Sequence, residues 1–125
     1  MNALLVAGTR IVIIALISYS IAIITEQKKQ VVNNIVLIFI TLGIVTDIIA
    51  TAFMITGSDN SLFTSHGILG YSSLAAMLID TILIWRHRIR NSKESQVNAG
   101  LHKYSRYAYI WWVLAFITGA ALVLL

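Results

Sequence analysis

The chain contains no cysteine and no proline, and charged residues make up only 11% of its 125 residues. Without cysteine, the protein has no disulfides, no thiolate metal site, no iron–sulfur cluster and no c-type haem attachment. Hydrophobic residues reach 58%, whereas soluble domains average about 45–50% apolar and about 25% charged residues. The composition therefore predicts one helical membrane domain over residues 1–125.

Long apolar runs predict how this domain is built. Runs of about 20 apolar residues, enough to cross a bilayer, occur at about residues 4–25, 35–55, 63–85 and 104–125. The first two connections are short, so neighbouring helices must run antiparallel. The predicted fold class is an all-α, polytopic membrane four-helix bundle of up-down topology.

Basic residues are concentrated in or beside the first and third connections. Eight of the nine lie there: Lys28, Lys29, Arg86, Arg88, Arg90, Lys93, Lys103 and Arg106. The connection around residues 57–60 has none. By the positive-inside rule, the first and third connections are cytoplasmic and both termini face outward across the plasma membrane. The net charge of +4 therefore indicates membrane orientation, with lipid rather than nucleic acid as the partner.

The third apolar segment carries its polar residues on one helical face. Steps of four and three residues connect His66, Gly70, Ser73, Met77, Asp80, Ile84 and His87. Because a lipid-exposed His or Asp is costly, this face is predicted to look into the bundle. There Asp80 either pairs with a cytoplasmic arginine or belongs to a site. His66 is expected near the outer surface and His87 among the arginines.

Asp47 lies near the middle of the second span. Burying an acid there costs roughly several kcal/mol unless it is protonated or paired. We expect it to face the bundle and to meet Arg10 of the first span or His66. Two interpretations stay open. Asp47 is either a structural link between helices, or a proton, ion or cofactor contact. Arg10 alternatively snorkels to the outer surface.

The fourth span has its own stripe at helical spacing: His102, Arg106, Tyr109, Trp112, Phe116 and Gly119. Of the adjacent Trp111 and Trp112, one should face the bundle, and flat apolar walls suit a planar ligand. Bundles hold haem with histidine imidazoles, and arginines pair with the propionates. With Asp80 and His87 on the facing helix, the pattern predicts a haem site between spans three and four.

Three segments taken together resemble a known family. They are residues 42–47 with Ala50, Thr51 and Met54; residues 66–77; and residues 101–105 with Trp112 and Gly119. In order and spacing they resemble the small four-span haem-sensing membrane proteins, the HsmA-like group, over about residues 40–120. The resemblance implies a four-helix membrane protein associated with haem, and it carries Asp47, His66, Met77 and His102 over as matching positions. Asp80 departs from the pattern, because relatives tend to carry a histidine there.

The leading hypothesis is a haem-binding or haem-responsive membrane protein that is not an enzyme in its own right. Its cofactor is haem, and its expected iron ligand is His102, with His66 or His87 as alternatives. His66 lies too close to the opposite surface to share one iron with His102.

Other functional classes remain open. A small proton-coupled transporter is one, although the dimeric small multidrug exporters carry their essential acid in the first span and residues 4–25 contain none. A membrane electron-transfer subunit and a ligand-free bundle are the others, and a homodimer is possible in each class. No nucleophile triad, phosphate-binding loop or paired-carboxylate hydrolase motif is present.

Overall fold

The computed structural model describes residues 3–57 and 65–124, with the side chains of 57, 65, 66 and 122–124 outside that description. It is a bundle of helices: α1 (Ala3–Lys29), α2 (Asn34–Gly57), α3 (Ser65–Arg90) and α4 (Ala99–Leu124). The all-α bundle is therefore confirmed. The predicted limits at 63 and 125 lie outside the described residues.

The helices run further than the apolar segments from which they were predicted. α1 continues from residue 25 to Lys29 because Glu, Gln and Lys are good helix formers and nothing interrupts them. It ends at Gln30, whose backbone adopts the left-handed conformation with φ of 57°. The amide of Gln30 donates to the carbonyl of Glu26 at 2.7 Å, which closes the last turn.

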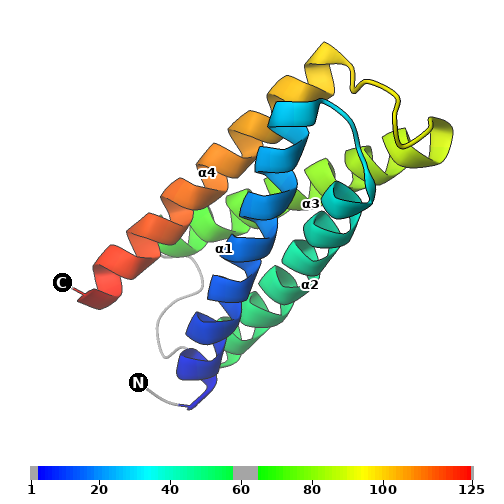
Figure 1. The fold of residues 1–125 in the computed structure, drawn as a ribbon. Helices are drawn as coiled ribbons and strands as arrows, with labels where there is room; N and C mark the ends of the chain where they lie inside the picture. Colours follow the sequence, from blue (N-terminus) through cyan, green and yellow to red (C-terminus); the bar gives the residue numbers. More distant parts are fainter. Residues whose placement is uncertain (1–2, 58–64, 125) are drawn as a thin grey trace.

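The helices alternate in direction, as Figure 1 shows. α1 packs chiefly on α2, and α3 packs chiefly on α4. The start of α1 and the end of α4 lie at one end of the bundle, and the linkers 30–33 and 91–98 lie together at the other (Figure 1). We call this second end the linker end.

Backbone contacts hold the two linkers against each other. The amide of Val97 donates to the carbonyl of Gln30 at 2.7 Å, and Val31 and Gln96 form an isolated antiparallel bridge. Arg88 of α3 reaches across to the carbonyl of Val32. The first and third connections therefore share one end of the bundle, as predicted.

The described residues have a mainly apolar core that also contains several polar side chains. The buried polar side chains are Ser18, Glu26, Asp47, Ser73, Asp80, Thr81 and Ser105. Large apolar side chains point outward on every helix, among them Ile17, Ile38, Ile82 and Ile117, all at least half exposed. An apolar exterior, with the polar side chains of the spans turned inward, suits lipid as the surrounding solvent.

Three of the described helices are long and apolar enough to cross a membrane: α1, α2 and α3. α4, whose first turns carry His102, Lys103 and Arg106, is not among them over its described residues. This finding indicates a membrane protein, and the fourth span remains a prediction.

Candidate functional site

Asp47 is the centre of a hydrogen-bonded cluster inside the bundle. It is 4% exposed, and its Oδ2 accepts a hydrogen bond from the Tyr19 hydroxyl of α1 and another from the Trp112 indole of α4, each at 2.8 Å. The rings of Tyr19 and Trp112 meet edge to face, with centroids 5.0 Å apart. One carboxyl thus links three helices.

Asp47 faces the interior of the bundle, as predicted. It does not bond to Arg10, which was one of its two expected partners. Arg10 is exposed, and it lies on the face of α1 that carries the outward isoleucines, so its cation points away from the interior. Neutral donors, Tyr19 and Trp112, take the place expected for a charge. The side chain of His66, the other expected partner, lies outside the described residues.

On α3 the predicted inward face is largely confirmed. Ser73, Met77, Asp80 and Ile84 are all buried, and Met77 sits in the apolar core. Asp80 is fully buried and does not pair with an arginine, in contrast to one of its two expected roles. Instead its Oδ1 accepts a hydrogen bond from Ser105 of α4 at 2.5 Å.

On α4 the face that is buried differs from the predicted face by a rotation about the helix axis. The buried positions are Leu101, Ser105, Ala108, Trp112 and Ala115. Of the predicted stripe, only Trp112 is fully buried, and Arg106 is exposed. The physical reason is that small residues at 105 and 108 let α4 approach the neighbouring helices closely. Trp111 points outward and donates to Ser72 at 3.0 Å, so the two tryptophans divide as expected.

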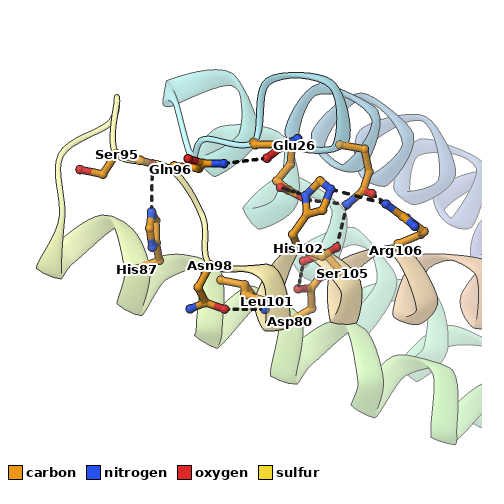
Figure 2. Close-up of polar contacts among 12 residues, drawn as sticks. Glu26, Asp80, His87, Ser95, Gln96, Asn98, Leu101, His102, Ser105 and Arg106 are labelled. Carbon is orange, nitrogen blue, oxygen red and sulfur yellow. Dashed lines mark hydrogen bonds and ion pairs between the residues drawn. The ribbon is translucent and has the colours of Figure 1, made fainter.

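His102 therefore faces α1 rather than α3. Its Nδ1 lies 2.7 Å from Oε2 of Glu26, whose side chain is only 1% exposed. Gln27 donates to the other oxygen of Glu26 at 2.6 Å and to the His102 carbonyl at 2.9 Å. Figure 2 shows these contacts at the linker end.

Arg106 also contacts this group of residues, from the exposed surface of the bundle. Its Nε donates to Oε1 of Gln27 at 2.9 Å, and its terminal nitrogen lies 3.5 Å from Nε2 of His102. We call Glu26, Gln27, His102 and Arg106 the histidine network. It is anchored on a buried acid and reaches the surface through a partly exposed imidazole and an exposed guanidinium.

His87 lies apart from the histidine network. Its Nε2 is 3.3 Å from the carbonyl of Ser95, as Figure 2 shows. Its Nδ1 is 3.4 Å from the side-chain amide of Asn91, and both partners lie in the linker that follows α3. His87 and His102 thus bond to different segments. His102 bonds to Glu26 of α1, and no contact between the two histidines is among the bonds that they form in the described residues.

The expected ligand space between α3 and α4 is filled by direct contacts. Ser105 bonds to Asp80, and the Tyr104 hydroxyl donates to the carbonyl of Ala76 at 2.9 Å. Trp112, predicted as a pocket wall, is committed to Asp47 and stacks on Phe116 with centroids 5.7 Å apart. Within residues 3–57 and 65–124 there is no group of three or more His, Cys, Asp or Glu side chains that could hold a metal.

The described surface includes shallow grooves, of which two are relevant to the predicted site. One, of about 380 Å³, follows α3 and is lined by Thr81, Ile82, Trp85, Arg86, Ile89 and Arg90. The other, of about 470 Å³, lies between the linkers and is lined by Val31, Asn33, Asn34, Ile35, Lys93 and Glu94. Neither contains a residue predicted to hold haem.

Glu26, Tyr19 and Ser105 are not among the predicted site residues. The predicted first span ends at residue 25, one position before Glu26, and so contains no acid. The available signal was helical spacing, since Tyr19, Ala22, Ile23 and Glu26 fall on one face of α1, and all four are buried.

In comparisons with models of protein families, with curated proteins and with solved structures, no match to this chain was found.

Proposed function

We propose that this chain is a four-span membrane protein that binds haem through a single imidazole, that of His102. The observation that carries the proposal is the pairing of His102 with the buried carboxylate of Glu26. A carboxylate that accepts from one ring nitrogen fixes the ring orientation and leaves the lone pair on the other nitrogen. Histidines that ligate metals are oriented in this way.

The donor chemistry of the histidine network fits such a ligand. With Nδ1 bonded to Glu26, Nε2 is the free nitrogen, and its contact with Arg106 is long at 3.5 Å. A metal at Nε2 would replace that weak contact. The guanidinium of Arg106 then lies beside the ligand, as a partner for a propionate. Haem, when bound, would supply an iron centre for ligand or redox sensing.

Among the described side chains, the two other candidates on α3 are bonded elsewhere. His87 bonds within the linker after α3, and Asp80 bonds to Ser105. We therefore propose five-coordinate haem in one chain, or six-coordinate haem shared between the His102 residues of two chains. A five-coordinate spectrum with one haem per chain would exclude the shared form. A bis-imidazole spectrum with one haem per two chains would support the homodimer.

The orientation proposed for the protein rests on charge. The linker end carries most of the basic residues, and the positive-inside rule assigns that end to the cytoplasm. The histidine network is then at the cytoplasmic side of the plasma membrane, and both termini are outside. This placement gives the proposed site access to a cytoplasmic haem pool.

The test is haem titration of the purified protein, read from the Soret band. The His102→Ala variant should lose the band, and free imidazole added to it should restore binding. Glu26→Gln should weaken affinity by about 10- to 100-fold, as loss of an outer partner does. His87→Ala is the matched control and should bind normally. Undiminished binding by His102→Ala would refute the proposal.

A proton-coupled transporter is the second candidate, and the structure removes one argument against it. α1 contains the buried acid Glu26, so the absence of an acid from residues 4–25 no longer distinguishes this chain from small exporters. Vesicles with an imposed pH gradient would test this candidate. Faster decay of the gradient with wild type than with Glu26→Gln would support it, and equal decay would contradict it.

A further inference from the structure

Asp80 has an unusual environment for a carboxyl group. The side chain is fully buried in α3, and Oδ1 accepts the Ser105 hydrogen bond. Oδ2 has no hydrogen-bond partner among the described residues. It is the one buried side-chain nitrogen or oxygen in that part of the chain without a partner, whereas buried polar atoms are normally bonded.

Among the described side chains, no Lys, Arg or His forms an ion pair with Asp80. Its electrostatic neighbours are Glu26 and Tyr19 of α1 and Tyr104 of α4. Glu26 is an acid and the tyrosines are neutral. Arg88, on the same helix, bonds instead to Val32 and Asn34 of the first linker and α2.

An ionised carboxylate in this position would be strongly destabilised. It would be out of water, would have one oxygen without a donor, and would have an acid as its charged neighbour. An unpaired buried charge costs roughly several kcal/mol. A carboxyl group in such a place therefore normally binds a proton and becomes neutral. A neutral carboxylic acid costs far less in the same place, because only one uncharged oxygen then lacks a partner.

We infer that Asp80 is a proton-binding site inside the bundle, occupied by a proton in the resting protein. On uptake, a proton from water forms an O–H bond with the carboxylate. On release that bond breaks and the proton returns to water, which leaves one negative charge in the membrane interior. The Ser105 hydroxyl bonds to either form. This inference depends on neither haem binding nor transport.

The experiment is infrared spectroscopy of the haem-free protein in lipid vesicles at neutral pH. A neutral carboxylic acid gives a carbonyl band apart from the amide bands, and an ionised carboxylate does not. We expect this band in wild type and its loss in Asp80→Asn. Asp47→Asn is the matched control, an equivalent change at the other buried acid, and it should leave the Asp80 component in place. Ser105→Ala should shift the frequency of the band.

Stability gives a second, independent readout. Asp80→Asn replaces a neutral acid by a neutral amide of the same shape, so its melting temperature should stay close to that of wild type. A variant that fails to fold, or a spectrum that Asp80→Asn leaves unchanged, would overturn the inference. Added sodium should not remove the band. Its removal by sodium would make Asp80 a metal-cation site, which also overturns the inference.

Discussion

The ring of Tyr19 on α1 occupies the space that any side chain at Gly43 on α2 would need. A Cβ added at Gly43 would meet the Cδ1, Cε1 and Cγ atoms of that ring. Because the same tyrosine donates to Asp47, the ring has little freedom to move aside. Gly43 thus sets how closely α1 and α2 approach.

The first prediction is that Gly43→Ala destabilises the protein by about 1–3 kcal/mol, the usual cost of overpacking a filled interior. The measurement is thermal or denaturant unfolding in detergent micelles. Gly70→Ala is the matched control, because a Cβ at Gly70 meets nothing within 4 Å. It should be neutral or stabilise α3 by up to about 1 kcal/mol. Equal effects of both substitutions would contradict this account, as would a stabilising Gly43→Ala.

The second prediction concerns the two donors that share Oδ2 of Asp47. An asparagine carbonyl can still accept from both Tyr19 and Trp112, whereas Asp47→Leu leaves both without an acceptor. Each buried donor without a partner costs about 1–3 kcal/mol. Asp47→Leu should therefore lower the unfolding free energy well below that of Asp47→Asn, measured in the same micelles. If the two variants unfold alike, the hydrogen bonds do not stabilise the bundle.

The third prediction uses the left-handed backbone at Gln30. A residue with a Cβ pays about 1–2 kcal/mol for this conformation, and glycine does not. Gln30→Gly also loses a side-chain bond from Gln96, so its unfolding free energy should lie near that of wild type. Gln30→Val should be clearly less stable, because branching at Cβ worsens the clash. A Gln30→Val variant as stable as Gln30→Gly would show that this turn is not under strain.

The helices, their order and the shared end of the two linkers followed from hydropathy and loop length. The inward face of α3 also followed, because its polar residues are few and fall on one stripe. α4 was harder to orient. Its polar and aromatic residues occur all around the helix. Ser105 donates to Asp80, but a small serine predicts an inward position less clearly than a charged residue such as its neighbour Arg106 does.

The sequence alone could not predict which side chains of the candidate site bond to one another. Glu26 and His102 are far apart in the chain, and so are Tyr19, Asp47 and Trp112. Which side chains meet depends on how each helix is rotated about its axis, and a mostly apolar sequence constrains that rotation weakly. Opposite charge was also a poor guide to contact here. Arg10 was the expected partner of Asp47, yet the neutral donors Tyr19 and Trp112 bond to that carboxyl.

The last prediction is the orientation proposed above for the protein in the membrane. The absence of native cysteine allows single cysteines to be introduced without background. Ser92 lies exposed in the linker 91–98, and Ser58 lies in the connection between α2 and α3, outside the described residues. With the linker end in the cytoplasm, an impermeant thiol reagent added to intact cells should label Ser58→Cys and spare Ser92→Cys.

Permeabilised cells supply the control, because both cysteines should then react if both are accessible to reagent. The expectation has a physical cause in the excess of Lys and Arg at the linker end, since positive charges near membrane spans are retained in the cytoplasm. Replacing Lys28 and Lys29 with glutamine should therefore weaken the preference, and some Ser92→Cys would become reactive in intact cells. Labelling of Ser92→Cys but not Ser58→Cys in the otherwise unaltered chain would invert the assignment. It would then place the histidine network on the outer side of the membrane.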